Sequence, residues 1–287
     1  MSQLYRHFHF LSLDIVLGAM ASSVLAARLF ESQPGWAWWI CLSLTVWLLY
    51  TGDHMLDAWR HRKKVEREMH HFMLRHKRNL IWFMGILAVV NMMLIINLLD
   101  KNALKYALVL AALVLLFYAF RHIFRRNRRF LIPGEFFILL IYLAGTWLGP
   151  VAAAWPGNAS SVANLERGQA LIAIMFAGVL LMNLGVISLY DIQLDTRLGL
   201  SSLARNLGPK ATRNMLIGTA VVILLLAVLQ FTILLSGRYT QFALIMAGMA
   251  FLLLIVLLMP SWFRRNDLYR WTADAVLYLG FLSLLVG

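Results

Sequence analysis

Residues 169–195 read QALIAIMFAGVLLMNLGVISLYDIQLD, an apolar run that ends in two aspartates four residues apart. An α-helix needs about 20 mostly apolar residues to cross the hydrocarbon core of a bilayer. The run therefore predicts a transmembrane helix near residues 169–191, with a pair of carboxylates at one end.

Comparable apolar runs extend along the rest of the chain. The 287 residues are 61% hydrophobic and 14% charged, with a mean hydropathy of +0.74. An ordinary soluble domain is about 45–50% apolar and about 25% charged. We therefore expect an all-α polytopic membrane protein, with one domain over 1–287 and about nine transmembrane helices around a central cavity. The expected spans lie near residues 9–28, 36–57, 80–99, 103–120, 131–152, 169–191, 214–235, 240–260 and 270–286.

The net charge of +13 is distributed unevenly over the loops. With a cytoplasmic N-terminus, about four fifths of the 26 Lys and Arg residues fall on the cytoplasmic side, as the positive-inside rule requires. The C-terminus is then expected on the opposite side. Because topology explains the charge, no nucleic-acid partner is expected. The single cysteine, Cys41, excludes an internal disulfide, and no removable signal peptide is expected.

Two acidic clusters stand at the cytoplasmic ends of expected spans, where ionisable groups are informative because the bilayer makes them costly. The sequence DHMLDAWRH covers residues 53–61, and DIQLD covers residues 191–195. Side chains four apart share a helix face. The sets that share a face are Asp53, Asp57 and His61 in one helix, and Asp191 and Asp195 in the other. If the two helix ends meet, four carboxylates converge as oxygen ligands for a cation such as Mg²⁺. The alternative is that they are interfacial carboxylates paired with neighbouring arginines.

Other polar residues lie inside expected spans. Asp14 and Asp274 are intramembrane acids that either serve an acceptor pocket, one of them as a base, or pair with a nearby arginine. Asn183 can form a hydrogen bond to a neighbouring helix. Glu135 lies in the first turn of a helix, where the dipole favours an acid.

Residues 190–208, YDIQLDTRLGLSSLARNLG, resemble the second Asp-rich motif of the UbiA superfamily of intramembrane prenyltransferases. That motif has the form D-x-x-x-D-x-x-x-G-[IL]-x-[ST]-L-x-x-x-x-G. The match includes both aspartates, Gly199, Leu200 and Gly208. The nine-span layout, with both acidic clusters on the cytoplasmic side, resembles the family over nearly the whole chain.

The first motif of the family, N-D-x-x-D-x-x-x-D on the second helix, is altered here. Asp53 takes the Asn position, His54 and His61 take Asp positions, and Asp57 is identical. Imidazole nitrogen suits transition metals better than Mg²⁺. A divalent metal other than Mg²⁺ is therefore an open alternative.

The resemblance implies a Mg²⁺-dependent prenyltransferase that ionises a prenyl diphosphate and transfers the isoprenoid chain to an aromatic or lipid-like acceptor. Membrane lipids and this hydrophobic acceptor are the implied partners. The implied catalytic residues are Asp57, Asp191 and Asp195. The implied metal ligands are these three with Asp53, and His54 and His61 are further candidates. Diphosphate binding is expected from Arg60, Lys63, Arg121 and Arg197, and substrate contact from Tyr50, Tyr118 and Tyr190.

Two other functions remain open at this point. A UbiA-type terpene cyclase would use the same site without an acceptor, so products formed from prenyl diphosphate alone would distinguish it. A non-catalytic isoprenoid-binding or transition-metal-binding membrane protein is the other alternative. Zinc or iron that co-purifies, and is lost on replacing His54 and His61, would favour that function.

Overall fold

The structure, a computed structural model, describes residues 8–60, 68–99, 101–124, 134–155, 166–234 and 237–286. These residues form helices and connections, with no strand among them, so the all-α fold class is confirmed. The long helices are α2 (Leu13–Leu29), α3 (Trp36–Arg60), α5 (Lys77–Leu98), α6 (Lys101–Phe124), α7 (Gly134–Ala154), α8 (Arg167–Leu198), α10 (Pro209–Leu229) and α11 (Gly237–Leu258). The last segment is α13 (Leu268–Val276), which continues as the 3₁₀-helix η5 (Leu277–Leu285).

Short elements join some of these helices. They are α4 (Glu68–Arg75), α9 (Leu203–Leu207), the π-helical turn η3 (Gln230–Leu234), α12 (Pro260–Phe263) and the 3₁₀ turn η4 (Arg265–Asp267). The long helices and the α13–η5 segment follow the nine expected spans in order. By length and composition alone, five helices of the described chain can cross a membrane, namely α5, α7, α8, α10 and α11.

The surface of these helices agrees with a lipid surrounding. Helix α5 is strongly apolar, yet most of its large side chains are exposed, including Trp82, Phe83 and Met92. An exposed apolar surface of this extent is not tolerated by a monomeric protein in water, whereas a bilayer solvates it. The protein is therefore an integral membrane protein.

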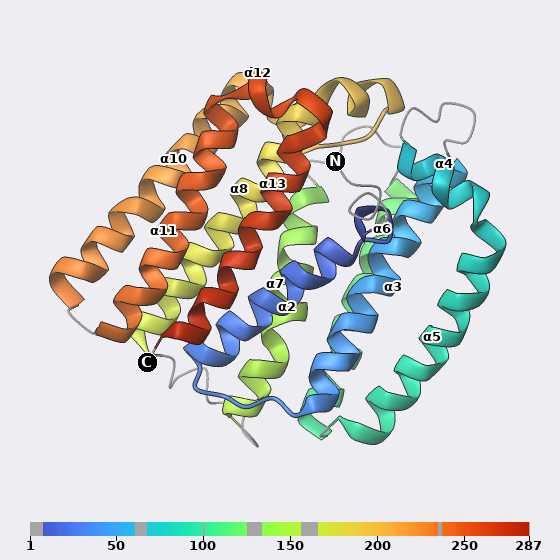
Figure 1. The fold of residues 1–287 in the computed structure, drawn as a ribbon, viewed down its shortest axis with the longest axis horizontal. Coiled ribbons are helices and arrows are strands. Elements are labelled where there is room, and N and C mark those ends of the chain that lie inside the picture. Colours follow the sequence, from blue (N-terminus) through green and yellow to red (C-terminus); the bar gives the residue numbers. More distant parts are fainter. Residues whose placement is uncertain are drawn as a thin grey trace.

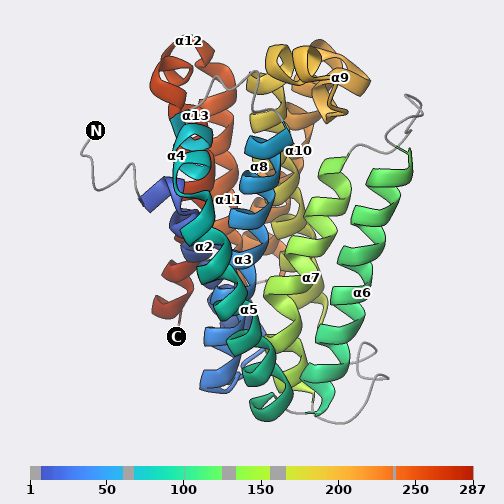
Figure 2. The ribbon, with the colours of Figure 1, turned by 90° about the vertical axis from the view of Figure 1, so that its right-hand side faces the viewer.

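Helix α8 forms the centre of the packed core. It packs against α7, α10, α11 and α13, and Phe176 and Met182 of α8 are wholly buried. Helices α5 and α6 lie toward the edge of the bundle (Figures 1 and 2), where they contact α3 and α7 respectively. The core thus joins the N-terminal, central and C-terminal helices.

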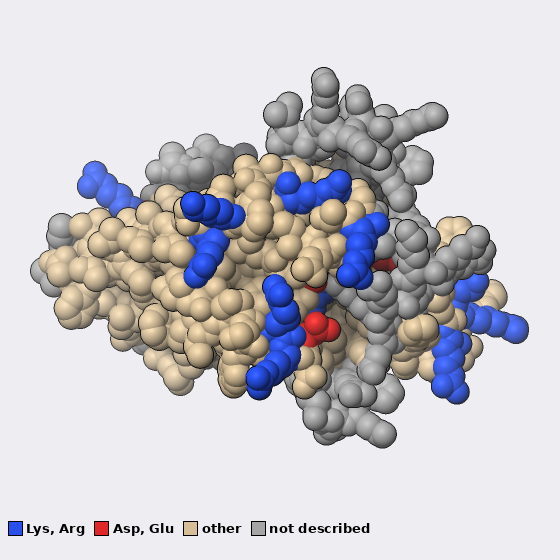
Figure 3. All heavy atoms as spheres, turned by 90° about the horizontal axis from the view of Figure 1, so that it is seen from above, with Lys and Arg blue, Asp and Glu red and all other residues tan. Residues whose placement is uncertain are grey.

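The two helices that carry the acidic clusters end at the same end of the bundle. Helices α3 and α8 both run toward the end where α4, α9 and α12 lie, at the top of Figure 1, and the C-terminus lies at the opposite end. Seen from that end, Lys and Arg side chains are spread over the surface, and acidic atoms are visible among them near its centre (Figure 3). The fold therefore brings both predicted motifs to one polar end.

Helix α2 packs closely along η5, and Gly280 makes this approach feasible. A Cβ atom at Gly280 would lie 2.6 Å from the backbone oxygen of Ala21. Backbone atoms cannot move aside cheaply. We expect Gly280→Ala to destabilise the fold by about 2 kcal/mol, within the usual cost of overpacking a core. Thermal unfolding in detergent measures this.

Gly218→Ala in α10 is the matched control, because Gly218 is exposed and a Cβ atom there would meet no other atom within 4 Å. Alanine in the middle of a helix is favoured over glycine by about 0.5–1 kcal/mol. The control is therefore expected to be neutral or slightly stabilising. Equal melting temperatures for the two variants would contradict close packing of α2 on η5.

Candidate functional site

Asp191 lies in a compact polar cluster formed by α8 and α13. Its Oδ2 forms an ion pair with the guanidinium of Arg270, and its Oδ1 accepts a hydrogen bond of 2.7 Å from the hydroxyl of Tyr269. The Nε of Arg270 donates to the Tyr269 hydroxyl at 3.1 Å. The side chains of Asp191 and Arg270 are only 11% and 22% exposed. The second acidic motif thus contains a largely buried, charge-balanced pair.

Stacked tyrosines support this pair. The rings of Tyr190 and Tyr269 lie 4.4 Å apart and nearly parallel, and the hydroxyl of Tyr190 donates to the carbonyl of Val256 in α11 at 2.7 Å. Arg264 lies over the Tyr190 ring, with its guanidinium carbon 5.9 Å from the ring centre. Tyr190, predicted to contact substrate, therefore also supports Tyr269 and Arg264.

Tyr269 lies just before the ninth expected span, at the polar end of the bundle. Its side chain is buried, and its hydroxyl donates a hydrogen bond to the carboxylate of Asp191.

An interhelical hydrogen bond sets the position of α13 against α8. The side-chain amide of Asn183 donates to the carbonyl of Ala273 at 2.6 Å. The prediction that Asn183 bonds to a neighbouring helix is therefore confirmed. The contact joins the middle of α8 to α13, about one helical turn along α13 from Arg270, which meets Asp191.

After Asp195 the backbone adopts a positive φ angle at the two glycine positions of the motif. Gly199 and Gly208 have φ angles of +70° and +85°, which side chains disfavour and glycine tolerates. Gly199 ends α8, and the amide of Leu200 bonds back to the carbonyl of Asp195 at 2.9 Å. Glu135, in the first turn of α7 as expected, also accepts the amide of Leu203 at 2.7 Å.

The first motif lies at the end of α3. The side chains of Asp53, His54 and Asp57 are partly buried, and Nδ1 of His54 lies 3.1 Å from the hydroxyl of Ser12. The ring of Tyr50 meets that of His54 edge-on, with centres 6.5 Å apart. One ring nitrogen of His54 is thus engaged with the segment that precedes α2.

The described part of the site offers few ligands to a metal ion. In the described ranges, no three His, Cys, Asp or Glu side chains gather in an arrangement that could hold one. Asp191 is already paired with Arg270, so a cation at this carboxylate would meet a guanidinium of like charge. The described residues as they stand therefore do not fit a resident metal centre.

Several predicted residues cannot be placed in the site. His61 and Lys63 lie outside the described residues, as do the side chains of Arg60, Tyr118 and Arg121. Arg197 and Asp195 lie in the last turns of α8, with Arg197 exposed and Asp195 partly buried. The roles assigned to all of these residues stay predictions.

Arg270 and Tyr269 are site residues that the sequence analysis did not single out. Arg270 entered it only as one of the positive charges on the cytoplasmic side. A sequence signal for it exists, because Arg270 and Asp274 are four residues apart on one face of an expected span. An arginine next to one intramembrane acid indicates that it can also pair with an acid on another helix, as Arg270 does with Asp191.

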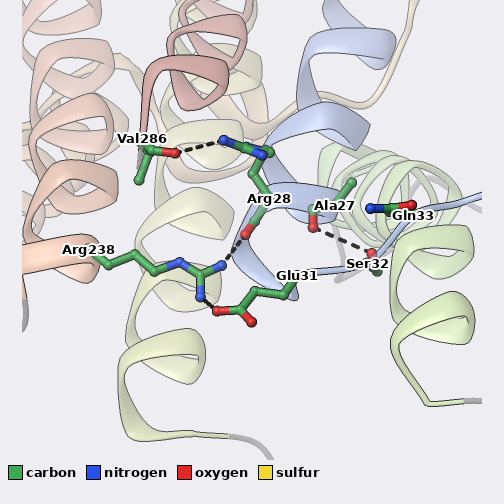
Figure 4. Close-up of a pocket in the computed structure, with 7 residues that line it drawn as sticks. All are labelled: Ala27, Arg28, Glu31, Ser32, Gln33, Arg238 and Val286. Carbon is green, nitrogen blue, oxygen red and sulfur yellow. Dashed lines mark hydrogen bonds and ion pairs between the residues drawn. The ribbon is translucent and has the colours of Figure 1, made fainter.

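A pocket of about 320 Å³ lies at the opposite end of the bundle, lined by Ala27, Arg28, Glu31, Ser32, Gln33, Arg238 and Val286 (Figure 4). Arg28 donates to the carbonyl of Val286 at 2.8 Å, and Arg238 pairs with Glu31 and with the carbonyl of Arg28. Both guanidinium groups thus join α2 to α11 and to the end of η5. These contacts make the pocket a structural junction.

The helix order and the shared end of α3 and α8 define a polytopic helical membrane protein (Figure 1). The chain is similar to a solved digeranylgeranylglyceryl phosphate synthase, with a TM-score of 0.51, 15% identity, and coverage of 95% of this chain and 96% of that one. At this identity the likeness concerns the fold, and it confirms the fold that the second Asp-rich motif predicted. Neither a protein-family model nor a curated protein sequence matches the chain.

Proposed function

We propose that this protein is an intramembrane prenyltransferase that ionises a prenyl diphosphate and transfers its isoprenoid chain to an aromatic or lipid-like acceptor. The observation that carries the proposal is the cluster around Asp191, at the polar end of an apolar helical bundle. The fold shared with a membrane prenyl synthase supports it. The transfer to an acceptor is inferred from the resemblance of residues 190–208 to the second Asp-rich motif of the UbiA superfamily.

The arginines of the cluster suit the head group of such a substrate. A guanidinium has five N–H donors, so Arg270 can bind Asp191 and Tyr269 and still donate to a phosphate oxygen. Arg264 adds a second guanidinium beside Tyr190. Two cations next to a departing diphosphate stabilise the negative charge that grows on it as the allylic carbon–oxygen bond breaks.

The rest of the bundle suits the chain of the substrate. The helices carry apolar side chains both in the core and on their outer surfaces. Apolar surfaces of this kind favour contact with an isoprenoid chain and exclude the water that would capture an allylic cation. Mg²⁺ enters the proposal only through the resemblance of the motifs. Cytoplasmic placement of the site belongs to the proposal as well, and rests on the distribution of Lys and Arg.

Pyrophosphate release by the purified protein in detergent tests the proposal. Allylic diphosphates of C10 to C20 are incubated with and without a membrane-lipid extract, with Mg²⁺ or with EDTA, and products are analysed by mass. We expect release with a prenylated lipid product. Isopentenyl diphosphate is the matched control, because it has the same head group but forms no allylic cation.

Each outcome has a separate meaning. Cyclised products without extract would favour the terpene cyclase, and activity retained in EDTA would remove Mg²⁺ from the proposal. If the folded protein releases no pyrophosphate from any allylic substrate with any added metal, the proposed function is wrong.

A further inference from the structure

A tight turn before α2 brings a histidine back onto that helix. The amide of Ser12 donates to the carbonyl of His9 at 2.8 Å, and Ser12 has a φ of +55°. Residues other than glycine seldom adopt such a φ, and strained positions of this kind cluster at functional sites. The turn allows Nδ1 of His9 to form a hydrogen bond with Oδ2 of Asp14.

Asp14 is buried and held on several sides. It is 3% exposed, its Oδ1 accepts the amide of Ile15 at 3.0 Å, and its carbonyl accepts the hydroxyl of Tyr278 at 3.0 Å. Pairing with an arginine was one of the two alternatives expected for Asp14, and its described partner is His9, because the turn at Ser12 brings the imidazole to the carboxylate. The carboxylate is thereby fixed as an orienting group.

The pairing sets the protonation pattern of the imidazole. A carboxylate only accepts hydrogen bonds, so Nδ1 of a neutral His9 carries the hydrogen and Nε2 carries the lone pair. Among the described residues, Nε2 has no hydrogen-bond partner. The His9 side chain is 17% exposed, and its ring lies 4.3 Å from that of Trp271. Nε2 is therefore a basic atom on an oriented ring.

The His9–Asp14 pair lies between the two acidic motifs. Ser12, in the same turn, contacts His54 of the first motif. Trp271, which packs on His9, follows Arg270, the partner of Asp191 in the second motif. Asp274 interacts electrostatically with Asp14, His9 and Arg270. The pair is thus next to the place where the proposed reaction breaks the bond to diphosphate.

We infer that His9 is the catalytic base of the transfer and that Asp14 orients it. The inference rests on the proposed function and names a hydroxyl group as the acceptor. The bond from C1 of the prenyl chain to the diphosphate oxygen breaks first, and the diphosphate leaves with that electron pair. The acceptor oxygen then forms a bond to the cationic C1, and Nε2 of His9 takes the hydroxyl proton. A positioned base of this kind contributes about 100-fold or more to rate.

Two products measured in one assay test this role. His9→Ala and His9→Gln are incubated with a C20 allylic diphosphate, with and without membrane-lipid extract, and both pyrophosphate and prenylated lipid are quantified. We expect prenylated lipid to fall about 100-fold or more, and to fall by a much larger factor than pyrophosphate release without extract. Added imidazole is expected to restore prenylated lipid in His9→Ala, which loss of a structural contact would not allow.

His71→Ala in α4 is the matched control, because His71 is an exposed histidine on the element that packs against α3. It is expected to leave both products unchanged. Prenylated lipid at the native level in folded His9→Gln would overturn the role of His9 while leaving the proposed function intact. Equal loss of both products without rescue by imidazole would also overturn it. Absence of pyrophosphate release from the native protein would overturn both.

Discussion

Asp191→Asn is expected to lower the rate of pyrophosphate release by about 100-fold or more, because Arg270 is then no longer held where it stabilises the charge that develops on the diphosphate. The amide keeps the size of the side chain but cannot balance the charge of Arg270. The amide oxygen can still accept the hydroxyl of Tyr269, but the amide nitrogen cannot accept from the guanidinium of Arg270 as Oδ2 does. Initial rates at saturating allylic diphosphate, normalised to folded protein, measure the effect.

Asp267→Asn is the control for this variant, because Asp267 is an exposed acid at the same end of the bundle. It is expected to leave the rate unchanged. The motif resemblance predicts comparable losses for Asp57→Ala and Asp195→Ala. Full activity in all three motif variants would contradict the proposed function.

Arg270→Gln is expected to destabilise the folded protein as well as to inactivate it. Removing one partner of a buried ion pair leaves the other charge uncompensated, at a cost of about 3–5 kcal/mol. The partial exposure of Arg270 and Asp191 favours the lower end, about 3 kcal/mol. The melting temperature in detergent is then expected to fall by roughly 5–10 °C.

The double variant Asp191→Asn/Arg270→Gln separates folding from chemistry. With both charges removed, neither is left unpaired, so the melting temperature is expected to return toward that of the native protein. Pyrophosphate release is expected to stay lost. A double variant less stable than Arg270→Gln alone would show that the pair does not hold α13 to α8.

Much of the fold was predictable from hydrophobicity alone. Each expected span has a helical counterpart, because runs of about 20 apolar residues must satisfy their backbone groups internally within a bilayer. The start of the first helix differed: the span was expected from residue 9, whereas α2 begins at Leu13. The turn at Ser12 causes this difference, and the positive φ of Ser12 cannot be predicted from a pattern of apolar residues.

The candidate site was less predictable, because helix rotation is set by tertiary contacts. Local spacing placed Asp191 and Asp195 on one face, and the motif glycines at 199 and 208 occur where φ is positive. The identity of the group that Asp191 faces depends on α13, which is distant in sequence. The bond from Asn183 to Ala273 and the stacking of Tyr190 on Tyr269 set that register.

The change from α13 to η5 affects how far the last segment can reach. Each part has nine residues, and as one continuous α-helix they would rise about 27 Å, less than the hydrocarbon thickness of about 30 Å. A 3₁₀-helix rises about 2.0 Å per residue, so winding the second half more tightly extends the segment to about 31 Å. The winding of η5 thereby brings the length of the last segment close to the hydrocarbon thickness, which the same residues in one α-helix would not reach.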